Sequence, residues 1–167
     1  MAAAPISAVD FREACAHFAT GVTVITAERS PGRVHGMTAN SFTSVSLEPL
    51  LVLVCVAETA QMLGILNQRR RFGVNVLKAG QHRVSEFFAQ PEQPEDVEAA
   101  PGVRFRWTSD GIPLLEDTLA QMTCRVVATH MAGDHTIFIS EVESVEMFPG
   151  EPLIFYGRRY HDFSPAR

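Results

Sequence analysis

Apolar residues occur along this chain in short runs separated by turn-forming residues, a pattern typical of strands joined by tight connections. The longest apolar run, residues 50–57, predicts a buried strand. Ser30, Pro31 and Gly32 predict the turn of a hairpin. Strands are predicted at residues 22–27, 34–39, 41–46, 50–56, 72–77, 120–131, 135–147, 153–156 and 159–163. So many antiparallel strands imply a mainly β fold, a closed or split barrel, because closure removes exposed strand edges.

Helical spacing of apolar residues predicts short helices at residues 8–19, 59–68 and 81–89. Ser7 can cap the first of these helices, and Asp10 places negative charge in its first turn. Its approximately helical apolar face consists of Val9, Ala14, Cys15 and Phe18. The helices are too short to change the mainly β assignment.

Residues 90–102, QPEQPEDVEAAPG, carry three prolines and four acidic residues, so they predict an exposed loop or a mobile flap. A domain linker is not expected there, because the chain that follows is too short for a second ample core. A chain of 167 residues can bury roughly 70% of its unfolded surface as one unit. We therefore expect a single domain over residues 1–167, with flexible ends at 1–7 and 164–167.

The charge of the chain is net negative, −5 at pH 7, and its basic residues are scattered apart from Arg69, Arg70 and Arg71. Nucleic acid and anionic membrane surfaces are therefore not expected as partners. The arginine run fits the solvated end of a helix, and a role in attracting a phosphorylated cofactor is the alternative. The longest apolar run, residues 50–57, is far shorter than the roughly 20 residues that a membrane-spanning helix needs.

The cysteines, Cys15, Cys55 and Cys124, are widely spaced and include no CxxC pair. A disulfide framework and a thiolate metal site are therefore not expected, and a cytoplasmic location fits. The six histidines have no spacing that would bring them together on a metal ion. The N-terminal sequence lacks a basic start followed by a long apolar stretch, so no signal peptide is expected.

The segment from residue 35 to residue 57, HGMTANSFTSVSLEPLLVLVCVA, joins small hydroxyl-bearing residues to an apolar strand. Its polar side chains are too small for a good core, and they offer both hydrogen-bond donors and acceptors. A large ligand could lie close to this backbone, over a stiff apolar floor. A surface strand, a turn and a buried strand would explain the same residues. Rossmann, P-loop, HExxH and GxSxG signatures are absent from the sequence.

Five sequence blocks occur in the order found in one known family. They are ATGVTVITA at 19–27, GMTANSFTSVSLEP at 36–49, FGVNVL at 72–77, GDH at 133–135 and PLIFYGRRY at 152–160. Over residues 11–160 the chain resembles the short-chain flavin reductases, which are the reductase components of two-component flavin-dependent monooxygenases. The resemblance implies a flavin-binding split β-barrel with Greek-key topology, usually found as a homodimer with flavin near the subunit interface.

The resemblance also implies which residues contact the flavin. Those along the flavin ring, the ribityl chain and the next strand end are Met37, Thr38, Ala39, Asn40, Ser41, Cys55, Val56 and Ala57. Thr59 and Gln81 would lie on the phosphate or adenylate side. A helix cap is the alternative for Thr59, and a solvent-facing position in a first helical turn is the alternative for Gln81.

His135 is predicted to stand at a barrel rim, because it follows a tight turn and opens a strand. In the family this histidine lies over the flavin, so the resemblance implies that it hydrogen-bonds the nicotinamide carboxamide or supplies a proton. His135 is therefore the candidate catalytic residue. Arg159 and Tyr160 would help to cover the nicotinamide or the adenylate, although ordinary solvation is expected for at least one of Arg158 and Arg159.

The activity that the resemblance implies is hydride transfer from NADH to FAD or FMN, with the reduced flavin passing to a separate monooxygenase. NADH is expected in preference to NADPH, because nothing in the sequence directs an arginine to a 2′-phosphate. The choice between FAD and FMN depends on the room beyond the flavin phosphate, which residues 90–102 would shape. Two alternatives remain open: a non-catalytic flavin- or haem-binding split barrel, and a purely structural interaction module.

Overall fold

The computed structural model describes residues 5–163 of the chain. Its helices are α1 (Ala8–Ala16), α2 (Gln61–Arg69) and α3 (His82–Phe88), with a 3-10 turn η1 (Val97–Ala99). Its strands are β1 (Thr20–Gly21), β2 (Thr23–Ser30), β3 (Arg33–Ala39), β4 (Thr43–Leu47), β5 (Leu50–Ala57), β6 (Arg71–Val76), β7 (Phe105–Trp107), β8 (Pro113–Leu115), β9 (Ala120–Ala132), β10 (His135–Met147), β11 (Leu153–Tyr156) and β12 (Arg159–Asp162). The mainly β fold expected from the sequence is confirmed.

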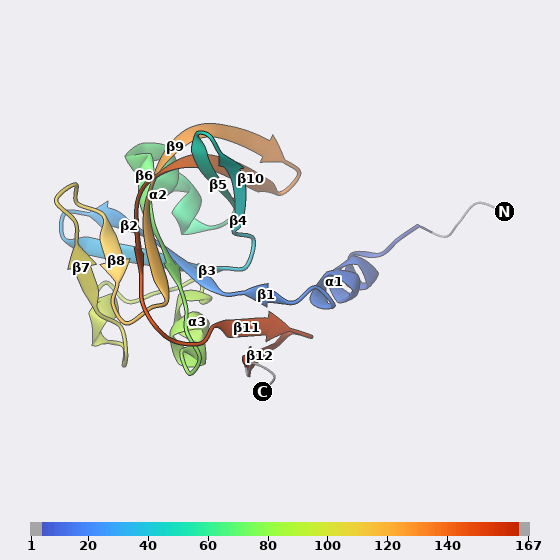
Figure 1. Cartoon of the computed structure of the whole chain (residues 1–167). Coiled ribbons are helices and arrows are strands. Elements are labelled where there is room, and N and C mark those ends of the chain that lie inside the picture. Colours follow the sequence, from blue (N-terminus) through green and yellow to red (C-terminus); the bar gives the residue numbers. More distant parts are fainter. Residues whose placement is uncertain (1–4, 164–167) are drawn as a thin grey trace.

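A seven-stranded antiparallel sheet in the order β3-β2-β6-β9-β10-β5-β4 forms the body of the molecule. Its two edge strands, β3 and β4, are consecutive in the chain, so the sheet curls back on itself into a split-barrel-like shape (Figure 1). Ser41 holds the connection in place, because its hydroxyl accepts a hydrogen bond from Cys55 N at 3.1 Å and donates one to Cys55 O at 3.2 Å. The edge strand β3 is thereby brought close to the end of β5.

Two hydrophobic clusters fill the molecule. In the first, Met62 and Leu66 of α2 are fully buried against Phe72 and Phe138 of the sheet, so α2 plugs the inside of the curl. The second cluster lies under α3 and the loop that follows it, and its members include Phe88. Since β3 borders both α2 and α3, the loops at their ends meet along this edge strand.

The hairpin of β7 and β8 was not expected from the sequence, and it is fixed to the sheet by buried polar groups. Asn75 accepts a hydrogen bond from Leu115 N at 2.8 Å and donates to Val24 O at 2.8 Å. The hydroxyl of Thr26 donates to Pro113 O at 2.5 Å. Gly73 allows the close approach, because a Cβ at this position would lie 2.8 Å from Pro113 O.

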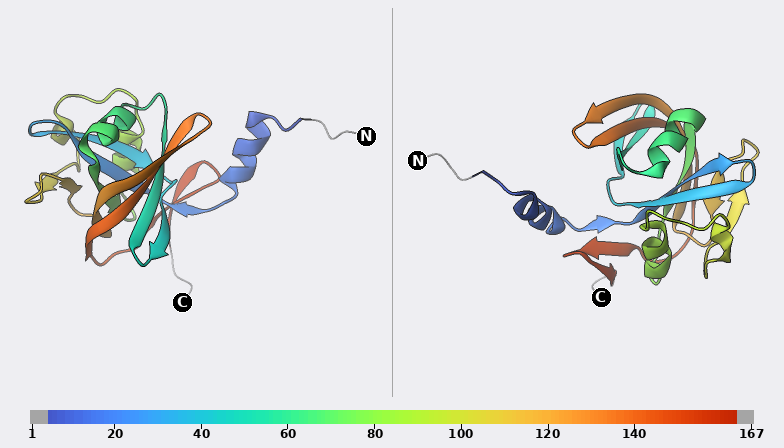
Figure 2. Two further views of the ribbon diagram at one scale, coloured as in Figure 1. Left: turned by 90° about the horizontal axis from the view of Figure 1, so that it is seen from above. Right: turned by 180° about the vertical axis from the view of Figure 1, so that it is seen from behind.

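Helix α1 stands away from the rest of the chain in all three views (Figures 1 and 2). Ser7 and Asp10 form the expected capping box, but the helix ends at Ala16 instead of residue 19. It ends early because residues 20–21 pair with β11 as strand β1. None of its residues is buried, and Phe18 beyond it is 76% exposed, so the predicted apolar face is not covered by any other part of residues 5–163.

Most predicted elements lie within two residues of their observed bounds, and 135–147 and 153–156 match them. The first four residues of the predicted flexible end 1–7, and all of 164–167, lie outside the described residues. Among residues 5–163, no helix has the length and apolar content that a bilayer crossing requires.

Candidate functional site

A cavity of about 420 Å³ lies along the edge strand β3, between the start of α2 and the loop after α3. Its lining includes Met37, Thr38 and Thr59, three of the residues expected to contact flavin. Gln93 closes one side: its amide donates to Gly36 O at 2.7 Å and accepts from Gly36 N at 3.4 Å. The first part of the loop predicted at residues 90–102 therefore forms a wall of this cavity.

The backbone of β3 offers neutral hydrogen-bonding groups to the cavity. Both backbone groups of Gly36 point away from β2, since they bond to Gln93. Residues two apart in a strand direct their backbone groups to the same side, so the amide and carbonyl of Thr38 also face away from β2. Because Gln93 occupies the Gly36 groups, the amide and carbonyl of Thr38 are the neutral groups that this edge offers to a ligand.

The side chain of Thr38 belongs to a chain of hydrogen bonds that crosses three elements. Its hydroxyl donates to Ser85 O at 2.6 Å, and the Ser85 hydroxyl shares a hydrogen bond with Tyr160 Oη at 2.9 Å. Thr38 therefore keeps lone pairs, but not its proton, for a ligand. The contact also links the cavity along β3 to the C-terminal hairpin of β11 and β12.

His135 opens β10 directly opposite Ala57 of β5, at the rim where the sequence placed it. Its side chain is 45% exposed, and its Nδ1–H donates to Asp134 Oδ1 at 2.8 Å. This hydrogen bond, followed by the charge of the ring, lowers the pKa of the Asp134 carboxyl. With Nδ1 held by a carboxylate, Nε2 is the atom of the ring available to a substrate.

The turn that carries His135 is tied to the end of β5. Glu58 N donates to Asp134 O at 2.9 Å, and the Thr136 hydroxyl donates to the Glu58 carboxylate at 2.5 Å. Because Thr59 follows immediately and lines the cavity, the imidazole and the cavity are positioned by the same strand end. His135 itself is not among the residues that line the cavity.

Arg159 and Tyr160 line a different cavity, of about 480 Å³, beside α3. The Tyr160 ring packs on Phe155 with ring centroids 5.3 Å apart, which fixes its hydroxyl toward Ser85. Arg159 is exposed. The structure therefore places these two residues apart from β3 and connects them to it through Ser85.

Several other candidate residues are placed outside the cavity along β3. Val56 is fully buried in the core, and Ala39 is 7% exposed. Asn40 is exposed and lines a separate cavity of about 240 Å³ with Phe42. Cys55 is half-buried.

The alternatives considered for Thr59 and Gln81 are both wrong. Thr59 caps no helix, because the N-cap of α2 is Ala60 and it has no side-chain cap bond. Gln81 does not face solvent: it is 8% exposed, accepts from Lys78 N at 2.9 Å and donates to Asp117 O at 2.9 Å. With its amide committed at both ends, Gln81 braces the chain around Lys78, while Thr59 faces the cavity.

Sequence reasoning missed Gln93 and His35, which both line the cavity. His35 stands immediately before the recognised block, and Gln93 lies in the acidic, proline-rich loop. A period-2 pattern carries no signal for either residue, because their roles arise from a loop folding onto a strand edge. Within residues 5–163, no group of three His, Cys, Asp or Glu side chains is arranged to hold a metal ion.

The comparison that decides the family covers most of the chain: a family model described as a flavin reductase like domain matches residues 15–164. The chain belongs to this family. Among the relatives of this flavin reductase-like protein, an NADH-dependent flavin reductase from a Rhodococcus species is 41% identical over 153 residues, which cover 90% of this chain and 84% of the relative. An NADH-dependent FAD reductase from Streptomyces globisporus is 40% identical over 163 residues, covering 96% and 88%.

A solved structure gives the same picture for the flavin reductase-like fold. The styrene monooxygenase flavin reductase from Pseudomonas putida S12 is 39% identical and has a TM-score of 0.83, covering 94% of this chain and 99% of the other. The cavity along β3 suits the group for which the family is named. Its lining combines the neutral backbone of β3 with apolar surface from Met37 and Met62.

Proposed function

We propose that this protein is an NADH-dependent flavin reductase that transfers hydride to FAD or FMN and supplies the reduced flavin to a separate monooxygenase. The observation that carries the proposal is the neutral edge of β3 beside the start of α2, in a chain that belongs to the flavin reductase-like family. A bound flavin would accept the hydride, and that chemistry belongs to the cofactor. The protein's task is to bind, to orient and to exclude water.

Each site residue has a defined task in this proposal. Met37 and Thr38 hold the flavin along β3, and Thr59 at the start of α2 lies near its phosphate. His135 presents Nε2 at the rim, where it hydrogen-bonds the nicotinamide carboxamide or holds a proton for the reduced ring. Tyr160 fixes the C-terminal hairpin against α3, and Arg159 helps to cover the nucleotide.

We also propose a homodimer. Isolated α1 carries Val9 and Phe11 at 66% and 64% exposure, and it has no buried residue in its own subunit. The outer side of β5 and β10 carries half-buried Leu53, Ile137 and Ile139, close to the start of β10 at His135. A second copy would cover these apolar surfaces and would place the flavin site near the interface. Light scattering that gave a fully active monomer at micromolar concentration would contradict this part.

The partner and location follow from the same activity. The solved relative from Pseudomonas putida is the flavin reductase of a styrene monooxygenase, and we propose an oxygenase partner of that kind for this chain. We place the single domain in the cytoplasm, where NADH is available and the free thiols of Cys15, Cys55 and Cys124 stay reduced.

The test is steady-state oxidation of NADH at 340 nm with added FAD or FMN. Turnover that depends on flavin concentration supports the reductase, and higher kcat/KM with NADH than with NADPH supports the nucleotide assignment. Retention of flavin without turnover would instead identify a carrier, and absence of both binding and turnover would leave a structural module. Adding an oxygenase component and its substrate then tests whether reduced flavin leaves the protein.

A further inference from the structure

The turn that carries His135 joins the two long strands β9 and β10 through Gly133 and Asp134 alone. A connection this short needs a positive φ, which Gly133 supplies at +67°. The side chains of Asp134 and His135 are 95% and 45% exposed. A hydrogen bond between two exposed side chains holds them only weakly. The position of the imidazole therefore depends on what holds the turn itself.

Glu58, the first residue after β5, bonds to the residues on both sides of His135. Its backbone N–H donates to Asp134 O at 2.9 Å, and its carboxylate accepts from the Thr136 hydroxyl at 2.5 Å. The last residue of β5, Ala57, already lies opposite His135, so these bonds extend the pairing of β5 with β10 by one residue. Any residue except proline could donate the first bond, but the second requires the Glu58 side chain.

The Glu58 carboxylate is bonded differently from the other glutamates of this part of the sheet. On β10, Glu141 and Glu143 both pair with Arg125. Glu58 forms no salt bridge with any described residue, and its bond goes to the neutral hydroxyl of Thr136. Ordinary pairing of surface charges therefore does not account for its position.

The same residue belongs to the turn that leads from β5 into the cavity along β3. Ala60 N donates to Ala57 O at 2.9 Å, which closes a four-residue turn with Glu58 and Thr59 at its centre. Thr59 and Ala60 line the cavity, whereas Glu58 does not. The residue that grips the His135 turn is thus one residue from the cavity wall, so it sets the position of the imidazole relative to the cavity.

We propose that Glu58 is a positioning residue, whose carboxylate holds the start of β10 so that His135 stays at one position relative to the cavity. The inference rests on the proposed function, in which His135 contacts the nicotinamide through Nε2. Hydride transfer demands close alignment of donor and acceptor, so a mobile imidazole would serve it poorly. Asp134 selects the ring tautomer, and Glu58 holds the turn that carries them both.

Replacement of the carboxylate tests the role of Glu58 in catalysis. Glu58→Ala should lower kcat/KM for NADH about fivefold, equivalent to about 1 kcal/mol, with less than about a twofold change in flavin affinity and little change in melting temperature. Glu58→Gln should stay within about twofold of wild type, because its amide oxygen accepts the same bond without the charge. Thr136→Val, which removes the donor and keeps the branched shape, should repeat the loss seen in Glu58→Ala.

A double-mutant cycle shows whether Glu58 acts through His135. In a His135→Ala background, Glu58→Ala should lower kcat/KM by less than about twofold further, because no imidazole remains to be positioned. The control is Glu116→Ala, which removes an exposed carboxylate that has no side-chain bond to any of residues 5–163 and should leave the kinetics unchanged. The same fivefold loss in both backgrounds, or early melting with loss of flavin in Glu58→Ala, would overturn the inference.

The state of the imidazole is measured without turnover by NMR of the histidine ring nitrogens. Wild type and Glu58→Gln should show His135 with its proton on Nδ1, the atom bonded to Asp134, whereas Glu58→Ala and Thr136→Val should shift it toward the Nε2–H form. An unchanged ring in both of the last variants would overturn the inference even where NADH is oxidised. The expected shift in a protein that oxidises no NADH would sustain the placement of the ring by Glu58 and contradict the proposed reductase activity.

Discussion

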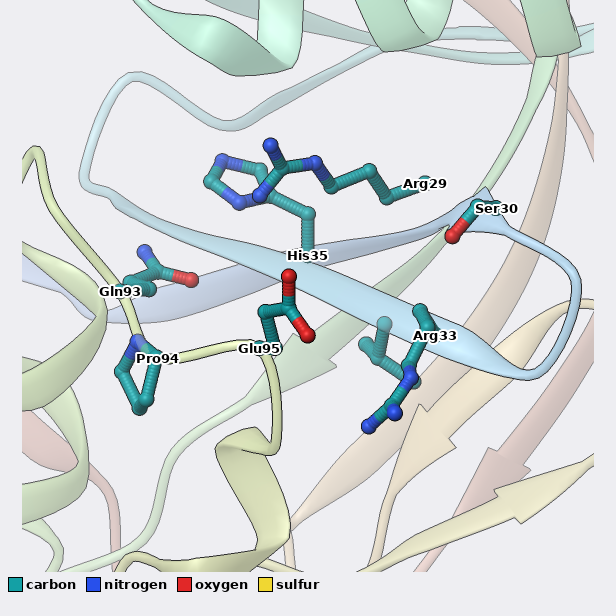
Figure 3. Close-up of a pocket in the computed structure, with 8 residues that line it drawn as sticks. Arg29, Ser30, Arg33, His35, Gln93, Pro94 and Glu95 are labelled. Carbon is teal, nitrogen blue, oxygen red and sulfur yellow. The ribbon is translucent and has the colours of Figure 1, made fainter.

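Buried polar groups on the β6 side of the barrel and those on the β3 side are treated in opposite ways. At β6, Asn75 uses both ends of its amide on other strands, and Thr26 of the neighbouring strand β2 bonds to the β8 backbone. At β3, the side chain of His35 is 5% exposed and lines two cavities, the one along β3 and the one of about 240 Å³ shown in Figure 3, and its ring forms no hydrogen bond with any of residues 5–163. The buried polar groups near β6 are hydrogen-bonded within the chain, whereas the His35 ring remains available to a ligand.

The difference separates residues that hold the fold from residues that serve the site. A buried amide that is fully paired contributes to stability, and removing it leaves its partners unsatisfied. An unpaired buried group costs stability, and it persists where a ligand completes it. Substitutions on the β6 side should therefore change unfolding, and substitutions on the β3 side should change binding or catalysis.

The largest expected effect comes from a pair of asparagines, one on each side. Asn75→Ala should lower the free energy of unfolding by about 4 kcal/mol, because it leaves Leu115 N and Val24 O without partners. Asn40→Ala, at an exposed position, should change it by less than about 0.5 kcal/mol. Urea unfolding of both variants measures the contrast. Similar losses in the two proteins would show that the comparison does not separate structure from site.

The burial of His35 should appear as a dependence of the free energy of unfolding on pH. Burial, and then the charge of Arg29, lower the pKa of His35 to about 4 in the folded chain, whereas the usual value for histidine is near 6.5. Below pH 6.5 the unfolded state therefore binds this proton more readily than the folded state does. The free energy of unfolding is therefore unreduced by this proton above pH 6.5, and it falls as the pH is lowered toward 4. The decrease should amount to on the order of 3 kcal/mol.

Replacing His35 tests this dependence. Urea unfolding between pH 4 and pH 7 should show a flatter pH profile for His35→Asn than for wild type. Arg29, Arg33 and Glu95 face the same cavity and keep their charges in the variant, so they do not account for a difference. His130→Asn, at an exposed position on β9, is the control. An unaltered slope in His35→Asn would mean that the ring is hydrated enough to titrate normally.

The positions of most strands along the chain, and His135 at the start of one of them, followed from the sequence, because alternation, turn residues and the recognised blocks are local signals. The residue ranges of β10 and β11 are the same in prediction and structure. The hairpin of β7 and β8 was missed, since its strands are three residues each and depend on Asn75 for anchoring. Propensity over three residues is too weak to compete with a loop assignment.

Helix α1 shows a different limit. Its cap and its apolar spacing are written in the local sequence, and the helix forms. Whether another surface covers that apolar face is not a local property, and no part of residues 5–163 covers it. In the same way, Gln93 acquires its role through a contact with Gly36 that joins residues 57 positions apart, which no pattern along the chain reveals.

At the start of β10, His135→Ala should reduce kcat/KM for NADH about tenfold to a hundredfold, a loss of about 1.4 to 2.7 kcal/mol in transition-state stabilisation. Flavin affinity and melting temperature should change little, because the ring is half-exposed and bonds only to Asp134 among the described residues. Stopped-flow hydride transfer, flavin titration and thermal melting on the same variant measure the three quantities. Early melting with loss of flavin would make His135 a structural residue, and wild-type kinetics would remove it from the site.

The smallest expected effect is at Gln93, whose side chain is hydrogen-bonded to Gly36 although it lies on the β3 side, beside the cavity. Its two hydrogen bonds to Gly36 hold a half-exposed loop against β3, so their loss should cost little stability but should loosen one wall of the cavity. Gln93→Ala should weaken flavin binding severalfold, about 1 kcal/mol, with the melting temperature nearly unchanged. Gln68→Ala, on the exposed face of α2, removes the same amide and should alter neither quantity. If Gln93→Ala instead lowers the melting temperature and binds flavin normally, Gln93 stabilises the fold, as Asn75 does, and does not serve the cavity.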